Sequence, residues 1–267
     1  DFTTSGGLLG ASCLELNGTN EYAIGADALV GIDNTYTIEG WFKSATDQNS
    51  CLLDISNSGD DSNRIKMELS SWSGSNRKLR FVLYNSSNSP TIVTQADADA
   101  IDVTDQKWHH VALTYAAGDI NAYLDGKLII TDTSTVSRAT TQSLRIGFGR
   151  DQRNNDTYFS GCLDEWRIWN VVRTPTDIRS NMFKQVDGTA SGVSHTATGL
   201  VRAYTMNEGN GQTLNDAQNN HTDVNITLYD AGGPENEALW AGAGTFNKGN
   251  STLTLTGSSK AFNLSAN

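Results

Sequence analysis

Two polar loops carry the side chains best suited to binding a metal. Both are rich in carboxylate and amide oxygens, the ligands that hard cations such as calcium require. The candidate ligands are Asp60, Asp61 and Asn63 in the first loop and Asp151, Gln152 and Asp156 in the second. Four clustered carboxylates would repel one another without a cation, so these residues predict one calcium site shared by both loops. The alternative is two solvated turns, since Asp and Asn are ordinary turn formers and Arg150 or Arg153 could pair with the carboxylates.

A second set of side chains is suited to binding a sugar. Aromatic rings stack on the apolar faces of sugars, and hydrogen-bonding groups fix the hydroxyls. The candidates are Trp72, Tyr84, Arg153 and Tyr158. Trp72 lies between Ser and Gly residues, as expected of a loop, whereas Trp41, Trp108 and Trp166 lie among apolar strand residues and are predicted to belong to the core.

The chain shows no catalytic pattern. A glycoside hydrolase needs two carboxylates flanking the scissile bond, and the nearest spacing, Glu235 and Glu237, falls in a predicted loop. There is also no H-E-x-x-H, no G-x-S-x-G and no Gly-rich phosphate loop. His109 and His110 are neighbours on a predicted strand, so we expect one to be buried and one exposed, and they cannot chelate one metal. We therefore predict that the protein is not an enzyme.

Charge and composition limit the partners. The 267 residues include 19 Lys and Arg against 30 Asp and Glu, for a net charge of -11. A nucleic acid needs a basic surface, so we expect no nucleic-acid partner, whereas cations and neutral molecules suit this surface. No run of 18 apolar residues occurs, so no membrane insertion is expected. The opening residues DFTTSGG do not resemble a signal peptide, and we expect the chain to be part of a larger protein.

Alternating apolar residues predict the strands that must position these side chains. Residues 108–131 read as three short strands in a row, and Asp125-Gly126 suits a two-residue hairpin turn between the last two. Another strand is expected at 161–170, where two acidic residues interrupt the apolar face. Further strands are predicted at 13–18 (with its turn), 22–24, 36–43, 52–55, 65–69, 79–83 and 144–149.

One short helix is predicted after the last of these strands. Thr174 is suited to the N-cap, Pro175 to the first helical position and Asp177 to the first turn. Ile178 and Met182 then share one face. We expect this helix to cover an edge or end of the sheets.

Four motifs in series resemble one family. They are W-H-H-V-A-L-T-Y from residue 108, A-Y-L-D-G-K from 122, L-R-I-G-F-G-R from 144 and G-C-L-D-E-W-R-I-W-N from 161. In this order they resemble the laminin-G-like jelly-roll family of the concanavalin A-like lectin/glucanase superfamily. The resemblance implies an all-β fold, a two-sheet antiparallel jelly-roll sandwich, often binding calcium and often carbohydrate or protein, although function varies on this fold. The order of the acidic loops resembles the related pentraxins, and the E-x-D-x-x-E of the laminarinase-type members is absent.

The resemblance implies two further features. Asn17 or Asn20 would lie near Asp164 and could form a second calcium position, the alternative being that Asp164 caps backbone amides at a β-bulge. Cys13 and Cys162 would lie in one sheet and would be the pair to test for a disulfide. The alternative is that all three cysteines are buried thiols.

The domain organisation also follows the resemblance. Residues 1–244 are predicted to form one domain, with a core at 8–184 and a returning flank at 185–244 that adds a strand beside it. Residues 245–267 read as a β arm, or as the start of a following module, because so short a segment cannot fold alone. The arm could mediate self-assembly.

Together these features predict a non-catalytic carbohydrate-binding or adhesion module of a larger extracellular or cell-surface protein. Its partner would be a glycan or a surface protein, and calcium would assist binding. The alternative is a structural or decorative domain of a surface fibre or virion appendage, located on the virion surface in the latter case.

The calcium prediction can be tested by thermal unfolding. Calcium at 100-fold above its Kd should stabilise the fold by about 2.7 kcal/mol and raise the Tm by a few degrees. Asp61→Ala and Asp151→Ala should each remove this rise if one ion bridges both loops. A melting curve that EDTA leaves unchanged would leave these residues as turn formers.

Overall fold

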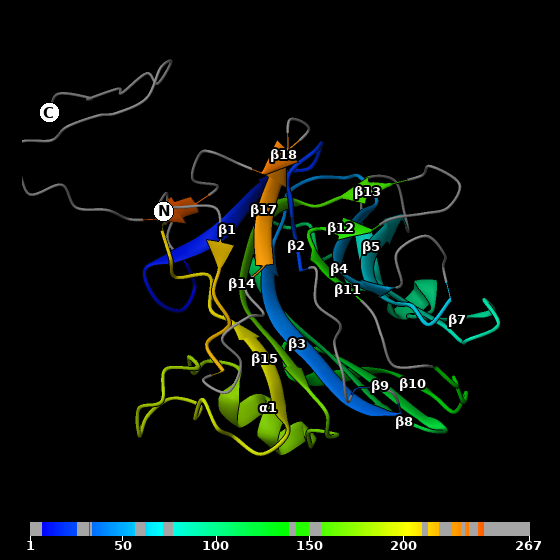
Figure 1. Cartoon of the computed structure of the whole chain (residues 1–267). Helices are drawn as coiled ribbons and strands as arrows, with labels where there is room; N and C mark the ends of the chain where they lie inside the picture. Colours follow the sequence, from blue (N-terminus) through cyan, green and yellow to red (C-terminus); the bar gives the residue numbers. More distant parts are fainter. Residues whose placement is uncertain are drawn as a thin grey trace, which may run out of the picture.

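The computed structural model describes residues 7–25, 32, 34–56, 62–71, 77–138, 143–149, 156–209, 213–218, 226–230, 233–234 and 240–242. Two large antiparallel sheets lie face to face (Figure 1). The all-β, two-sheet antiparallel jelly-roll sandwich with one short helix is therefore confirmed. In these residues the α-helix has 7 residues, and no helix is long and apolar enough to cross a membrane.

The first sheet contains eight of the described strands. Its order is β10-β9-β8-β3-β14-β1-β19, and β15 also pairs with β14. The strands are β1 (Ser12–Asn17), β3 (Thr35–Lys43), β8 (Trp108–Ala116), β9 (Asp119–Leu124), β10 (Lys127–Asp132), β14 (Ser160–Trp169), β15 (Leu200–Tyr204) and β19 (Trp240–Gly242). The predicted run of three strands is confirmed as β8, β9 and β10.

The second sheet contains nine described strands in the order β16-β17-β2-β11-β4-β5-β6-β7, with β18 beside β17. They are β2 (Tyr22–Ile24), β4 (Ser50–Ser56), β5 (Ile65–Ser71), β6 (Arg77–Tyr84), β7 (Pro90–Thr94), β11 (Ser143–Ile146), β16 (Thr213–Leu214), β17 (Ile226–Asp230) and β18 (Gly233–Pro234). A small hairpin of β12 (Phe148–Gly149) and β13 (Thr157–Tyr158) follows β11, and a short 3₁₀ helix, η1 (Asp97–Asp99), follows β7.

The predicted flank contributes strands to both sheets. β15 pairs with β14 in one sheet, and β17 pairs with β2 in the other. Residues 240–242 pair with β1. The predicted arm at 245–267 lies outside the described residues, so its role in self-assembly stays a prediction.

The Asp125-Gly126 turn forms as its residue types require. Both residues have positive φ, 51° and 75°, as a tight hairpin turn of this kind demands. The Asp125 carboxylate also accepts from the His110 amide at 2.8 Å and contacts His109 Nδ1 at 2.9 Å. The turn is thereby tied to the start of β8.

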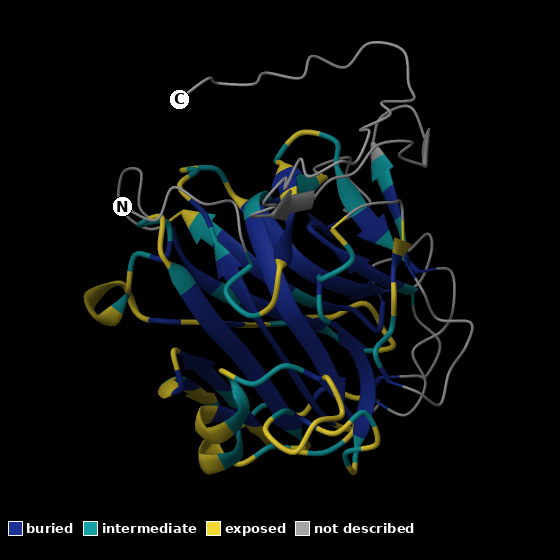
Figure 2. Ribbon diagram, turned by 90° about the vertical axis from the view of Figure 1, so that its left-hand side faces the viewer, coloured by how far each residue is buried: buried dark blue, intermediate teal, exposed yellow. Residues whose placement is uncertain are grey.

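The helix α1 (Pro175–Asn181) has the predicted cap and covers the outer face of the first sheet. Thr174 Oγ1 accepts from the Asp177 amide, and the Asp177 carboxylate accepts from the Thr174 amide. Ile178 packs against Ala112 and Tyr123 of β8 and β9. The ribbon is buried along the strands and exposed on the outward side of α1 (Figure 2).

The cover provided by α1 and the residues after it corrects one expectation. His109 and His110 face opposite sides of the sheet, beside Phe42 and Trp41 respectively. Both are buried, at 8% and 1% exposure. The predicted exposure of one histidine is wrong because the outer face of the sheet is not open to solvent there.

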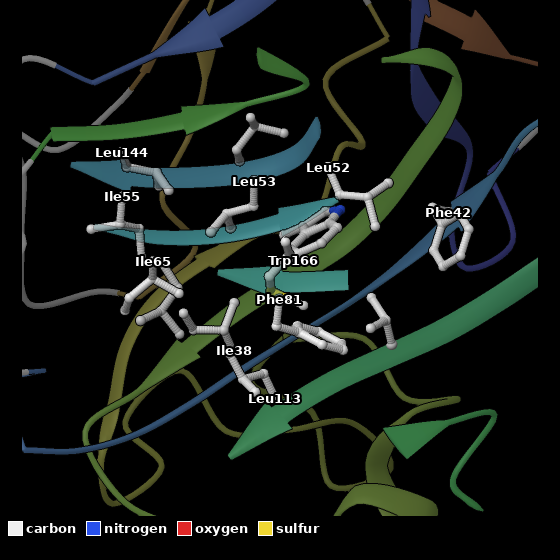
Figure 3. Packing of buried hydrophobic residues seen from close by; sticks show 14 of the residues in the cluster. Ile38, Phe42, Leu52, Leu53, Ile55, Ile65, Phe81, Leu113, Leu144 and Trp166 are labelled. Carbon is white, nitrogen blue, oxygen red and sulfur yellow. The ribbon is translucent and has the colours of Figure 1, made fainter. Parts of the chain in front are cut away.

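The core lies between the two sheets. Ile38, Phe42 and Leu113 of the first sheet face Leu53, Ile55, Ile65 and Phe81 of the second, with Trp166 between them (Figure 3). Trp166 is fully buried and lies directly over Gly40. A Cβ atom at position 40 would lie 2.5 Å from the indole, so only glycine fits beneath this ring.

We expect Gly40→Ala to destabilise the fold by about 1–3 kcal/mol, the usual cost of overpacking a core. The free energy of urea unfolding measures this effect. In a double-mutant cycle with Trp166→Leu the cost should shrink, because the smaller side chain leaves room for the methyl group. An equal cost in both backgrounds would show that the indole is not the cause.

Candidate functional site

Four of the predicted loop ligands, Asp60, Asp61, Asp151 and Gln152, lie outside the described residues, and so do the predicted sugar contacts Trp72 and Arg153. The remaining predicted ligands, Asn63 and Asp156, are described. No group of three His, Cys, Asp or Glu side chains in the described part of the chain is placed to hold a metal ion.

The strand register separates the described residues that flank the two polar loops. The first loop leaves β4 at Ser56, and β11 runs antiparallel to β4 with Ser143 opposite Ser56 and Ile146 opposite Leu53. β12 therefore reaches the other end of β4, where Gly149 lies against Cys51. Ser56 and Cys51, at the two ends of β4, are about 16 Å apart at about 3.3 Å per residue.

This separation concerns the two described ligands of the predicted shared calcium site. Asn63 precedes β5 beside the Ser56 end of β4, whereas Asp156 precedes β13 beside the other end. Calcium ligands lie 2.3–2.6 Å from the ion, so these two side chains cannot contact one ion. Asn63 and Asp156 therefore cannot both belong to the shared site, and the other four ligands lie outside the described residues, so the site stays a prediction. A calcium ion at either loop alone stays a prediction, and the two loop substitutions should then act independently in the EDTA test.

The second calcium position is also corrected by the register. Asn17 lies opposite Ser160, and Leu14 lies opposite Leu163, so Asp164 is four residues further along β14 than Ser160. The Asn17 side chain accepts from the amides of Thr19 and Asn20 and donates to the Asn20 side chain. Asn17 and Asn20 therefore close a turn and do not approach Asp164.

Asp164 caps backbone amides, as the alternative predicted. Its carboxylate is fully buried and accepts from the Leu9 amide at 3.0 Å. It lies at a break in the β3–β14 register between Asp164 and Arg167. Burial raises the pKa of Asp164 to about 8. The carboxyl group thus holds the N-terminal segment against the sheet.

Four aromatic rings form a row across the second sheet and the adjoining β12–β13 hairpin. Tyr22 of β2 stacks on Tyr229 of β17, with ring centroids 5.5 Å apart and planes 13° apart. Phe148 of β12 lies 4.7 Å from Tyr22 and 4.9 Å from Tyr158 of β13. Tyr22, Tyr158 and Tyr229 are half-buried. We call these four residues the aromatic row.

Strand pairing assembles the aromatic row. Tyr22 pairs with Tyr229, and Phe148 pairs with Tyr158. Their neighbours Ala23 and Leu228 point into the core, so Tyr22 and Tyr229 point outward because side chains alternate along a strand. Between β11 and β12, Gly147 has a φ of 75°, and a Cβ there would lie 2.1 Å from Leu16.

Amide groups border the aromatic row at Tyr158. Gln48 Nε2 donates to the carbonyl oxygens of Gly18, at 3.1 Å, and of Tyr158, at 3.2 Å. It thus ties β13 to the turn that contains Asn17 and Asn20. Burial and the nearby Asp156 carboxylate raise the pKa of the Tyr158 hydroxyl, which therefore stays protonated at neutral pH and can donate a hydrogen bond.

Paired charges occupy the same outer face on neighbouring strands. Glu68 contacts Lys66 Nζ at 2.8 Å and an Arg80 guanidinium nitrogen at 2.9 Å. Asp54 contacts Arg64 at 2.7 Å. Because each carboxylate has a cationic partner, this part of the face is a network of ion pairs, while the aromatic row offers rings and hydroxyl groups.

Two other buried carboxylates have structural roles. Glu39 accepts from Trp169 Nε1 at 2.9 Å, and Glu165 contacts Arg167 at 3.1 Å. Burial raises the pKa of both carboxyl groups. Arg167 also donates to the carbonyl oxygens of Asn181 and Lys184, so the group attaches the end of α1 to the sheet.

The structure brings together only some of the predicted residues. Tyr158 belongs to the aromatic row, and Asp156, Asn17 and Asn20 lie in adjoining segments. Tyr84 ends β6 opposite Pro90, at the far end of the same face. Tyr22, Phe148 and Tyr229 were not predicted, because their contact depends on which strands are neighbours.

Comparison with known proteins gives a match to one family model and none to a protein of curated function. The family model described as "Concanavalin A-like lectin/glucanases superfamily" matches residues 17–179. No protein of curated function matches the sequence.

Solved structures share the fold at low identity. A candidate carbohydrate-binding protein of Bacteroides ovatus ATCC 8483 is 18% identical with a TM-score of 0.58, over 85% of this chain and 61% of that protein, so the present chain spans about three fifths of its length. A heptameric SAP-like pentraxin of Limulus polyphemus is 15% identical with a TM-score of 0.50, over 70% of this chain and 83% of that one. Domains LG4-5 of the mouse laminin alpha1 chain give 19% identity and a TM-score of 0.47, over 60% and 41%.

The buried Asp164 predicts a pH dependence of stability. Its pKa rises from 3.8 in the unfolded chain to about 8 in the fold. Between pH 3.8 and pH 8 the folded state therefore keeps a proton that the unfolded state has lost. Stability should therefore fall as the pH rises through this window, by up to about 1.4 kcal/mol per pH unit. Asp164→Asn, which remains neutral, should flatten urea-unfolding free energies measured between pH 5 and pH 8. Parallel profiles for Asp164→Asn and wild type would contradict this role, and the exposed Asp156→Asn serves as control.

Proposed function

The chain belongs to the concanavalin A-like lectin/glucanase superfamily, and from that membership we propose that it is a non-catalytic carbohydrate-binding module. The observation that carries the proposal is the aromatic row, in which two half-buried tyrosines stand on the outer face of the second sheet and a third stands on the adjoining β12–β13 hairpin. Rings of this kind bind the apolar faces of sugars, while their hydroxyl groups bind sugar hydroxyls. The Bacteroides ovatus structure, named as a candidate carbohydrate-binding protein, supports the same assignment.

The roles within the aromatic row differ by position. Tyr22 has Tyr229 on one side and Phe148 on the other, so its ring is largely occupied by protein. Tyr158 and Tyr229 stand at the two ends of the row and are the rings we assign to sugar contact. Gln48 fixes the backbone at Tyr158, and the Asn17 and Asn20 amides beside it are suited to sugar hydroxyls.

Neutral glycans suit the overall charge better than anionic ones. The chain carries a net charge of -11, and the Asp156 carboxylate lies close enough to Tyr158 to raise its pKa. An anionic sugar would be repelled from this end of the row. We further propose that the module acts in an extracellular protein and that calcium, held by either polar loop, assists binding.

A glycan array followed by titration tests the proposal. Tyr158→Ala and Tyr229→Ala should each weaken binding of the selected glycan by roughly tenfold, the equivalent of about 1.4 kcal/mol of lost ring contact. Tyr158→Phe keeps the ring and separates stacking from hydrogen bonding. Tyr84→Ala is the matched control, because Tyr84 stands on the same face but away from the row.

Each outcome decides a different part of the proposal. If Tyr158→Ala and Tyr229→Ala bind with wild-type affinity and Tyr84→Ala loses binding, the sugar site lies at the other end of the face. If EDTA leaves glycan binding unchanged, calcium does not assist binding, and the carbohydrate-binding proposal still stands. A fully folded chain that binds nothing on the array would favour a structural domain of a larger assembly.

A further inference from the structure

Two of the three cysteines lie together on the outer face of the first sheet. Leu14 pairs with Leu163 and Glu15 with Cys162, so Cys13 and Cys162 are diagonal neighbours on one face of β1 and β14. They form a small cluster of their own with the half-buried Trp108 against them. All three cysteines are free and buried. The third cysteine, Cys51, lies in the other sheet and donates to the Met67 carbonyl oxygen.

The two thiols differ in reactivity. Cys162 is 6% exposed, whereas Cys13 and Cys51 are completely buried. Interaction with the neighbouring Cys13 thiol lowers the pKa of Cys162, and the ammonium group of Lys43, which pairs with Cys162 from β3, lowers it further. Interaction with Cys162 and burial raise the pKa of Cys13. Because the thiolate is the nucleophile, Cys162 is the thiol that reacts first.

We propose that Cys13 and Cys162 form a dithiol modification site that a small-molecule disulfide oxidises to an intramolecular disulfide. The Cys162 thiolate attacks one sulfur of the small disulfide and displaces one small thiolate, which takes up the proton from Cys162. The Cys13 thiol then loses its proton and attacks Cys162 Sγ, and the second small thiol leaves with that proton. The protein loses two hydrogens, and one small disulfide becomes two small thiols.

The bond would join the first and last strands of the predicted core. β1 and β14 are already paired and the two cysteines share one cluster, so the sulfurs can approach to about 2.05 Å without any change in strand pairing. The cross-link spans most of the chain and would restrict the unfolded state. We therefore expect the oxidised protein to melt several degrees higher than the reduced one.

Oxidised glutathione is the probe for a direct test on the whole chain. The reduced protein is incubated with it, blocked with N-ethylmaleimide under denaturing conditions, and analysed by intact mass and peptide mapping. We expect one maleimide, on Cys51, and a linked peptide pair containing Cys13 and Cys162. Dithiothreitol should restore three maleimides.

Matched variants make the result decisive. Cys51→Ser should cross-link as wild type does, and Cys13→Ser should keep one glutathione on Cys162. Cys162→Ser should react at Cys13 at least tenfold more slowly, and Lys43→Met should slow the first step in the wild-type background. Circular dichroism confirms that each variant is folded.

Three results would overturn the proposal. They are glutathione retained on Cys162 of the wild type without a cross-link, modification of Cys51 as fast as Cys162, and three free thiols after prolonged oxidation.

Discussion

One extra residue in β14 is the constraint on which most of the first sheet depends. Asp164 lies opposite Trp41 and Arg167 lies opposite Glu39, so β14 takes three steps where β3 takes two. Glu165 absorbs the difference with a φ of 51°. Because faces alternate along a strand, this β-bulge reverses the alternation after it. Trp166 therefore enters the core above Gly40, and Arg167 points outward to the end of α1.

The two outer faces of the sandwich have different uses. On the first sheet, α1 and the residues after it cover the polar side chains, and Trp41 Nε1 donates to the Met182 carbonyl oxygen at 2.7 Å. Burying Glu39, Glu165 and Arg167 is tolerable only because they pair and hydrogen-bond with one another. This face stabilises the fold. On the second sheet, the aromatic row stands on short strands and the neighbouring hairpin, and its three tyrosines are half-buried.

The candidate site contains some residues that the sequence alone could identify and others that it could not. Tyr158 could be identified because a tyrosine beside a polar loop is suited to sugar contact. Tyr229 could not, because it meets Tyr22 only through pairing of β17 with β2, strands about two hundred residues apart in sequence. The composition of the polar loops predicted one shared metal site, whereas the strand register places Asn63 and Asp156, the two described ligands, near opposite ends of β4.

Local chemistry in the sequence determined the elements. The positive φ that Asp125-Gly126 accepts set one hairpin, the Thr174 cap set the start of α1, and period-2 alternation set the strands and the all-β class, because these signals act between residues close in sequence. Only the tertiary structure decided which strands became neighbours. That choice depends on how two sheets and α1 share their apolar surfaces, and it placed Cys13 beside Cys162, buried both histidines and gathered the aromatic row.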